Sequence, residues 1–234
     1  MMEPPRLGIL GGMGPLATAE FMARLVRATP ASCDQEHIPV IVCSLPQIPD
    51  RTEAILGAGA SPVPMMQSGL KMLERCGVEC IAIPCNTAHF WISELQEATG
   101  VPILHMVDAV ASILHQSYAP RSVGLLATDA TIAAGTYTSR LHGMGIKVIS
   151  PSAPAQATVM HSIRAIKSGT EPRLPELESV VDELVARGAE CTVLACTELS
   201  TVRLRRANAA VIDSTEALAE VCIQRLLPKI PSQK

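Results

Sequence analysis

Short apolar runs alternate along the whole chain with longer stretches in which apolar residues recur at helical spacing. Each run is about 4–8 residues long and rich in Val, Ile and Leu, which is typical of strands buried on both faces of a parallel sheet. We therefore expect strands at residues 6–10, 39–44, 80–84, 102–105, 123–127, 147–150, 192–195 and 210–213.

The longer stretches predict helices, and several of them stop at a glycine. Gly77 and Gly188 directly follow two of these stretches, where a glycine commonly ends a helix, and Pro175 stands where a first helical turn tolerates proline. The expected helices are residues 16–29, 64–76, 87–98, 131–142, 156–168, 175–187 and 215–227. Strands and helices that alternate in this way predict an α/β fold.

The two halves of the chain repeat each other. Residues 75–85 can be laid over residues 186–196, and a glycine, a glutamate and two cysteines then coincide at a constant offset of 111 positions, from 85 to 196. Two further pairs of segments match, 7–10 with 123–126 and, roughly, 102–106 with 210–214. Reuse of a small residue vocabulary by α/β proteins is the alternative explanation, but cysteines at corresponding places favour a duplication.

The duplication predicts two pseudosymmetric lobes, each a four-stranded parallel sheet flanked by helices, with the active site in the cleft between them. We expect the N-terminal lobe to comprise residues 1–106 together with residues 212–234, which bring the C-terminal helix back to it. The second lobe is expected to comprise residues 107–211.

The composition excludes several classes of protein. Apolar residues make up 48% of the 234 residues and charged residues only 18%, so the chain can bury a core and extended disorder is not expected. The net charge is -3 and the chain has no long run of Lys or Arg, which argues against nucleic-acid binding. No apolar stretch approaches the ~20 residues that span a membrane, and residues 1–6 are too short and proline-rich for a signal peptide. We therefore expect a cytoplasmic protein with no membrane or nucleic-acid partner, whose eight cysteines are thiols.

Two of these cysteines stand out by their positions. Cys85 and Cys196 each follow one of the matching strands, and polar residues come next, Asn86 and Thr87 in the first half and Thr197 in the second. Ligands bind at the carboxyl ends of parallel strands, so the duplication predicts one thiol on each wall of the cleft. A helix that begins at each cysteine would lower the pKa of its thiol.

Such a pair of thiols suits the inversion of an α-carbon. One thiol would remove the α-proton as a base, and the other would replace it on the opposite face as an acid. If each sulfur lies about 3–3.5 Å from the reacting carbon, the two sulfurs are roughly 7 Å apart. Hydrogen-bond donors from Asn86, Thr87 and Thr197, aimed at the α-carboxylate, could stabilise the carbanion without a cofactor.

Four motifs resemble the aspartate/glutamate racemase family. They are residues 11–15 (GGMGP), 49–52 (PDRT), 84–89 (PCNTAH) and 195–199 (ACTEL), and they occur in the family's order over nearly the whole chain. The resemblance implies a homodimer that racemises an amino-acid substrate without pyridoxal phosphate, with Cys85 and Cys196 as the acid and the base. It also implies substrate contacts from Met13, Arg51 and Lys167.

The second cysteine motif indicates a branch of this family. Cell-wall glutamate racemases usually carry Cys-Thr-His there, whereas this chain has Cys196, Thr197 and Glu198. Together with the first two motifs, this favours the aspartate racemase and broad-specificity amino-acid racemase branch. There Arg51 and Lys167 would bind carboxylates, as an acidic substrate requires. The expected substrate is aspartate, glutamate or a wider set of amino acids, because the two cations alone do not decide between them.

Other interpretations of these motifs also need to be considered. Residues 12–17 fit the dinucleotide pattern G-x-G-x-x-A, but the next strand ends without the acid that would bind a ribose, so no NAD is expected. Cys76, Cys80 and Cys85 lack zinc-site spacing, so no metal is expected. The alternatives in function are another reaction of the same superfamily, such as hydantoin racemisation or maleate isomerisation, and a two-lobe small-molecule binding protein.

Overall fold

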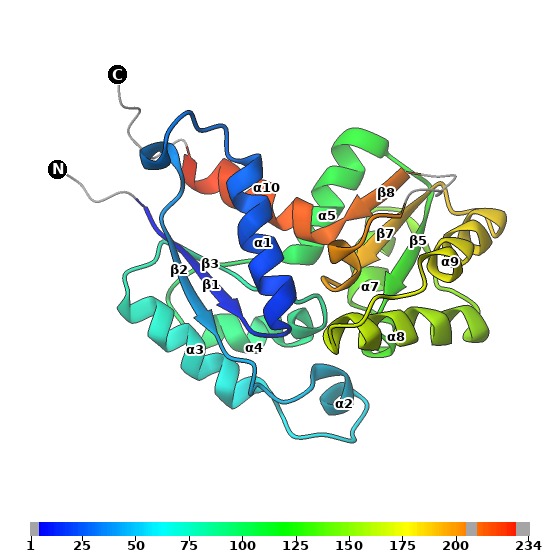
Figure 1. Ribbon diagram of the computed structural model, residues 1–234, viewed down its shortest axis with the longest axis horizontal. Coiled ribbons are helices and arrows are strands. Elements are labelled where there is room, and N and C mark those ends of the chain that lie inside the picture. Colours follow the sequence, from blue (N-terminus) through cyan, green and yellow to red (C-terminus); the bar gives the residue numbers. More distant parts are fainter. Residues whose placement is uncertain (1–4, 205–209, 228–234) are drawn as a thin grey trace.

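The computed structural model describes residues 5–204 and 210–227, which form two four-stranded parallel sheets flanked by helices (Figure 1). The first sheet contains β1 (Leu7–Gly11), β2 (Val40–Ser44), β3 (Cys80–Ala82) and β4 (Ile103–Leu104), in the order β2-β1-β3-β4. The second contains β5 (Ser122–Ala127), β6 (Lys147–Ile149), β7 (Cys191–Ala195) and β8 (Ala210–Asp213), in the order β6-β5-β7-β8. Each of the eight predicted strands overlaps one of these observed strands. The predicted α/β fold with two four-stranded lobes is confirmed.

The two sheets share their register as well as their strand order. Gly8 of β1 pairs with Ile81 of β3, and Gly124 of β5 pairs with Thr192 of β7. Thr192 is the residue that the sequence repeat aligns with Ile81. The repeat therefore describes equivalent positions in space.

The last strand of each sheet leads into a helix through an equivalent cap. After β4, Nδ1 of His105 accepts the N–H of Val107 over 3.2 Å. At the end of β8, Oδ1 of Asp213 accepts the N–H of Thr215 over 2.8 Å. A side-chain acceptor at this position satisfies one of the free N–H groups at a helix start.

Helices cover the sheets in each lobe. The α-helices are α1 (Pro15–Ala28), α2 (Arg51–Ile55), α3 (Val63–Arg75), α4 (Ile92–Glu97), α5 (Met106–Ile113), α6 (Asp129–Ala134), α7 (Thr136–His142), α8 (Ala153–Lys167), α9 (Leu174–Ala186) and α10 (Ser214–Leu226). The 3-10 turns are η1 (Asp34–Glu36), η2 (Thr87–Trp91) and η4 (Leu199–Thr201), and η3 (Leu114–Tyr118) is a π-helical turn. Within the described residues no helix is both long and apolar enough to cross a membrane.

Three helical segments differ from the sequence prediction. Residues 131–142 lie in two helices rather than one, because Gly135 adopts a left-handed conformation (φ 66°) between α6 and α7. Residues 87–98 begin with the 3-10 turn η2 before α4. The sequence pattern does not predict α5, because the helix has only eight residues and five of them are buried, which leaves a narrow polar face of Asp108 and Ser112.

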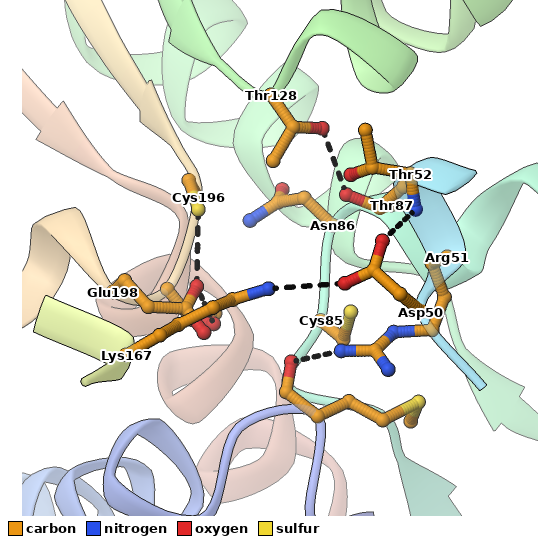
Figure 2. A pocket seen from close by; sticks show the side chains of 12 residues that line it. Asp50, Arg51, Thr52, Cys85, Asn86, Thr87, Thr128, Lys167, Cys196 and Glu198 are labelled. Carbon is orange, nitrogen blue, oxygen red and sulfur yellow. Dashed lines mark hydrogen bonds and ion pairs between the residues drawn. The ribbon is translucent and has the colours of Figure 1, made fainter. Parts of the chain in front are cut away.

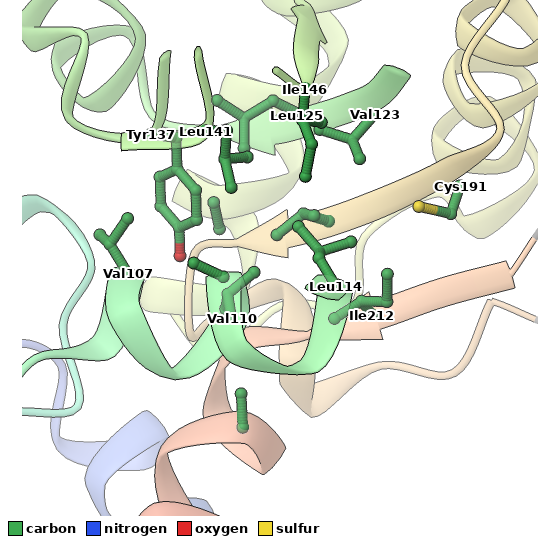
Figure 3. Packing of buried hydrophobic residues seen from close by; sticks show 14 of the residues in the cluster. Val107, Val110, Leu114, Val123, Leu125, Tyr137, Leu141, Ile146, Cys191 and Ile212 are labelled. Carbon is green, nitrogen blue, oxygen red and sulfur yellow. The ribbon is translucent and has the colours of Figure 1, made fainter. Parts of the chain in front are cut away.

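Helices α5 and α10 each leave one sheet and pack in the other lobe. Helix α5 follows β4 of the first sheet, yet Val107 and Val110 lie in the core of the second lobe (Figure 3). Helix α10 follows β8 of the second sheet, and its residues Leu218 and Cys222 lie in the core of the first lobe. The two helices also contact each other. The lobes are therefore joined by exchanged helices.

The exact boundary between the two lobes stays a prediction. The packing of α10 supports the expectation that the C-terminal helix returns to the first lobe. Strand β8 pairs with β7 along its whole length, so the second sheet runs to Asp213, past the predicted boundary at residue 212. Residues 1–4 and 228–234, which the prediction gives to the first lobe, lie outside the described residues.

Gly124 lies where helix α9 approaches the second sheet closely. A Cβ atom here would lie 2.9 Å from Leu184 of α9 and 3.1 Å from Oγ1 of Thr192. We expect Gly124→Ala to lower the free energy of unfolding by about 1–3 kcal/mol, because overpacking displaces neighbours in a dense core. Urea denaturation followed by circular dichroism measures this change.

Gly143→Ala is the matched control for this substitution. Gly143 has a φ of −61°, and a Cβ atom there would meet nothing closer than 3.5 Å. Equal unfolding free energies for the two variants would contradict the close packing at Gly124.

Candidate active site

A pocket is lined from both lobes at the carboxyl ends of their strands (Figure 2). Met13 and Cys85 come after β1 and β3, and Thr128 and Cys196 come after β5 and β7. The lining includes all eight residues that the sequence analysis proposes for the site. The twelve lining residues are Met13, Asp50, Arg51, Thr52, Cys85, Asn86, Thr87, Thr128, Lys167, Cys196, Thr197 and Glu198.

The space inside this pocket is small. Its free volume is about 10 Å³, roughly what one water molecule needs. A second cavity of about 380 Å³ adjoins it and shares Asp50, Arg51, Lys167 and Glu198 in its wall. An amino acid is larger than one water molecule, so its binding in the first pocket requires these side chains or the lobes to move apart.

The two cysteines lie in equivalent turns. The N–H of Ala88 donates to the carbonyl of Cys85 over 3.2 Å, and the N–H of Leu199 donates to the carbonyl of Cys196 over 3.0 Å. Both thiols are free and buried. A short 3-10 turn, rather than an α-helix, follows each cysteine. The duplication thus extends into the pocket, while the separation of the two sulfurs stays a prediction.

Cys196 is held in its thiol form. Its S–H donates to Oε2 of Glu198 over 3.0 Å (Figure 2). Burial raises the pKa of Cys196 well above its usual value and the carboxylate of Glu198 raises it further, while Lys167 acts in the opposite direction. The prediction of a lowered pKa is wrong for Cys196, because burial and the carboxylate of Glu198 outweigh the backbone N–H of Glu198, which acts in the predicted direction.

Glu198 is a pocket residue that the sequence analysis did not propose for the site. It is buried, and besides the Cys196 thiol its Oε2 accepts the Thr197 hydroxyl over 3.5 Å. Its Oε1 is buried with no hydrogen-bond partner among the described residues. The motif Cys-Thr-Glu places a carboxylate near the cysteine in sequence. Only the folded turn, however, brings the side chain of Glu198 into contact with the sulfur of Cys196.

Arg51 is buried and held by backbone carbonyls. Its Nη1 donates to Ile48 and Pro49, and its Nη2 donates to Met13, each over 3.1 Å. Its Nε is buried and has no hydrogen-bond partner in the part of the chain that the structure describes. Nε and the second Nη2 hydrogen therefore stay free to bind a carboxylate as a fork.

An ion pair joins the lobes across the pocket. Lys167, the last residue of α8, places Nζ 3.7 Å from Oδ2 of Asp50, the N-cap of α2 (Figure 2). Burial opposes the charge on Lys167, but the carboxylate of Glu198 and the Cys196 sulfur raise its pKa overall. The pKa of Asp50 is lowered because backbone N–H groups of α2 and the charge of Lys167 outweigh its burial. The two side chains are 33% and 39% exposed, so the pair is a weak contact that a substrate could replace.

Asn86 joins the two lobes by hydrogen bonds. Tyr137 of α7 donates its hydroxyl to Oδ1 of Asn86 over 2.6 Å, and Nδ2 of Asn86 donates to Ser214 of α10 over 2.9 Å. All three side chains are buried. The two bonds fix the orientation of the amide and leave one Nδ2 hydrogen for another acceptor. No pattern in the sequence pointed to Tyr137, because only the packing of α7 brings it to Asn86.

The hydroxyl of Thr87 also contacts the second lobe. It lies 3.0 Å from the hydroxyl of Thr128 and 3.0 Å from that of Thr131, at the start of α6. Thr128 and Thr131 are themselves 2.9 Å apart, so the three hydroxyls form a closed cluster. The structure thus brings Thr87 to the pocket but engages its side chain with the opposite lobe.

His89 supports the turn that carries Cys85. The N–H of Met106 donates to its Nε2 over 3.0 Å, so its Nδ1 carries the proton and donates to the carbonyl of Cys85 over 2.9 Å. Burial and then the neighbouring His105 lower the pKa of His89 to about 4. The ring is therefore neutral and ties the cysteine turn to the start of α5.

Solved racemases share this fold. The aspartate racemase of Picrophilus torridus superposes with a TM-score of 0.86 at 37% sequence identity, over 95% of this chain and 94% of that one. The glutamate racemase of Francisella tularensis, solved with D-glutamate, superposes with a TM-score of 0.70 at 20% identity, over 99% of this chain and 84% of that one. At that identity, the second match shows a likeness of fold alone.

Sequence comparison leads to the same class of protein. The broad specificity amino-acid racemase RacX of Bacillus subtilis is 30% identical over 230 residues, which are 94% of this chain and 98% of that protein. The fold and these relatives define a racemase, an enzyme of the isomerase class. A sequence model of the Asp/Glu/Hydantoin racemase family matches residues 10–222, and the chain belongs to this family. The family predicted from the four motifs is confirmed.

Tyr137→Phe tests whether Tyr137 orients Asn86. The substitution keeps the ring but removes the hydroxyl donor, so Oδ1 of Asn86 loses its partner and the amide can rotate. We expect kcat/KM for racemisation to fall about tenfold, with kcat falling more than KM rises, since such a bond contributes about 1–1.5 kcal/mol and an oriented amide would act mainly on the charge that develops during the reaction. Steady-state kinetics and thermal unfolding measure the two effects separately.

Tyr118→Phe is the control, because Tyr118 is exposed and its hydroxyl makes no hydrogen bond within the described residues. A Tyr137→Phe variant that loses stability but keeps its kcat would limit Tyr137 to a structural role.

Proposed function

We propose that this protein is a cofactor-independent amino-acid racemase in which Cys85 and Cys196 exchange the α-proton from opposite faces of the substrate. The observation that carries this proposal is the position of the two thiols. They come from equivalent strand ends of two duplicated lobes, and they line the same pocket. A substrate bound between the lobes would have one thiol on either side.

In the proposed reaction, the thiolate of one cysteine takes the proton from Cα, and the thiol of the other donates a proton to the opposite face. The negative charge that develops spreads into the α-carboxylate. Donors already held in position, such as the free Nδ2 hydrogen of Asn86, would stabilise that charge more than the charge of the ground state. Asn86 and Arg51 are both held by other protein groups, so little reorganisation is needed during the reaction.

We further propose that the substrate is aspartate, glutamate or a wider set of amino acids. The support is a pair of cations from opposite lobes, Arg51 on α2 and Lys167 on α8, both in the pocket wall. Two carboxylates of an acidic substrate could each meet one cation. The similar proteins include an aspartate racemase and a broad specificity amino-acid racemase, so both outcomes remain within the proposal.

We also propose a cytoplasmic homodimer. The eight cysteines are free thiols, which suits a reducing compartment. The dimer is an expectation from the family resemblance.

The two-thiol mechanism predicts a specific labelling pattern. When one enantiomer of the substrate is incubated in D2O, the opposite enantiomer should form with deuterium at Cα, because the donating thiol exchanges its proton with solvent. Cys85→Ala and Cys196→Ala should each abolish this inversion, since either face would lack its acid or base. Chiral chromatography with mass spectrometry measures both results.

Cys33→Ala is the control for this experiment, because Cys33 is an exposed thiol that does not line the pocket. Inversion without solvent deuterium, or full activity in either active-site variant, would refute the two-thiol mechanism.

The choice between an acidic and a broad substrate can be tested at Lys167. We expect Lys167→Met to lower kcat/KM for aspartate about 10–100-fold, because a charge-assisted hydrogen bond to a carboxylate contributes about 1.5–3 kcal/mol. The loss for alanine should be smaller, since alanine has no side-chain carboxylate. Racemisation rates of both amino acids measure the difference.

Lys71→Met is the control, because Lys71 is exposed on α3 and lies outside the pocket lining. Equal losses for aspartate and alanine in Lys167→Met would mean that Lys167 does not recognise the side chain.

A further inference from the structure

The two lobes differ at one pair of equivalent positions in the pocket. The repeat that aligns Cys85 with Cys196 also aligns Thr87 with Glu198. In the first lobe this position carries a hydroxyl that is engaged by threonines of the other lobe. In the second lobe it carries a carboxylate that accepts the thiol proton of Cys196 over 3.0 Å. Among the described residues, no hydrogen bond joins the Cys85 sulfur to a carboxylate.

A racemase that works in both directions needs each thiol to serve as a base in one of them. The thiolate, not the thiol, is the base. Cys196 is almost fully buried and its proton is already directed at Glu198, so that proton must leave before Cys196 can act. Within hydrogen-bond distance of the sulfur, the described side chains offer Oε2 of Glu198 as the acceptor.

We propose that Glu198 is the proton acceptor that converts Cys196 into a base. The S–H bond of Cys196 breaks and its proton binds Oε2 of Glu198, which leaves a thiolate and a neutral carboxylic acid. The thiolate then takes the proton from Cα of the substrate. When Cys196 later acts as an acid, it gives its proton to the carbanion and recovers one from Glu198. This inference rests on the racemase mechanism proposed above.

The charges around the pair suit such a transfer. Both Glu198 and the Cys196 sulfur raise the pKa of Lys167, so its ammonium group lies close enough to act on both. Moving a proton from sulfur to oxygen therefore keeps the negative charge near the same cation. The transfer also neutralises a carboxylate whose Oε1 is buried without a donor among the described residues, an arrangement that is costly for a charged group. The other charged groups in the pocket lining are Asp50 and Arg51.

The test uses β-chloroalanine, because its breakdown needs a base but no acid. The base takes the α-proton, the electron pair forms the Cα=Cβ bond, and chloride leaves from Cβ. Water then hydrolyses the aminoacrylate to pyruvate and ammonia, and lactate dehydrogenase reports the pyruvate. Each enantiomer presents its α-proton to only one cysteine.

The cysteine variants calibrate this assay. The enantiomer that still eliminates in Cys85→Ala is the one whose proton faces Cys196. The enantiomer that still eliminates in Cys196→Ala is the one whose proton faces Cys85. If neither variant shows this selectivity, the two-thiol mechanism itself fails, and the role of Glu198 fails with it.

Glu198→Gln keeps the size of the side chain but cannot hold the transferred proton. We expect initial elimination from the Cys196-facing enantiomer to fall at least about 100-fold, the lower range for loss of a general base. Elimination from the Cys85-facing enantiomer should change less than about threefold, which also shows that the pocket is intact. Glu198→Asp should restore part of the loss. Glu94→Gln is the matched control, because Glu94 is exposed on α4.

Three results would overturn the proposal while leaving the two-thiol mechanism in place. An equal loss for both enantiomers in Glu198→Gln would assign Glu198 to structure or binding. Unchanged rates for both enantiomers would show that solvent takes the proton. A Glu198→Asp variant no better than Glu198→Gln would show that the carboxylate is not the group that matters.

Discussion

Each parallel sheet must bury both of its faces, and in this protein each lobe completes its cover with a helix that begins in the other lobe. Helix α5 starts after the first sheet and lies in the core of the second lobe, while α10 does the reverse. The two exchanged helices also contact each other. This arrangement brings residues that follow the strands of both sheets to one pocket, so the pocket depends on it.

Hydrogen bonds then hold the edges of that pocket together. Asn86 next to the first cysteine is bound by Tyr137 and Ser214, which lie on α7 and α10. Thr87 is bound by hydroxyls at the start of α6. These contacts are buried, whereas the ion pair between Asp50 and Lys167 on the outer side is partly exposed. Opening for a substrate should therefore begin at the ion pair, the less costly of the two sets of contacts to break.

The duplication has preserved the geometry of the site more closely than its chemistry. The two cysteine turns repeat the same backbone hydrogen bond, and the strands before them pair in the same register. The residue two positions after each cysteine differs, however, as Thr87 in one lobe and Glu198 in the other. Two thiols in equivalent places thus face different surroundings, and among the described residues only the thiol of Cys196 donates a hydrogen bond to a carboxylate.

The sequence by itself determined much of the fold and most of the residues that line the pocket. Continuous apolar runs marked the eight strands, of which the central strands β1, β3, β5 and β7 are buried on both faces and therefore do not alternate in polarity. The internal repeat selected Cys85 and Cys196 from eight thiols, because equivalent strand ends meet at a cleft. All eight residues proposed for the site from the sequence line the pocket, although the catalytic and binding roles given to these residues remain proposals.

Only the tertiary structure decided the features that depend on distant neighbours. Helix α5 has only a narrow polar face in its own sequence, because the other lobe covers most of its surface. The pKa of Cys196 is raised rather than lowered, because burial and Glu198 act on it where a helix start was expected. Tyr137 reaches Asn86 from 51 positions away. Patterns along the chain report which residues are buried or end a strand, but they do not report which side chains meet once two lobes have closed on each other.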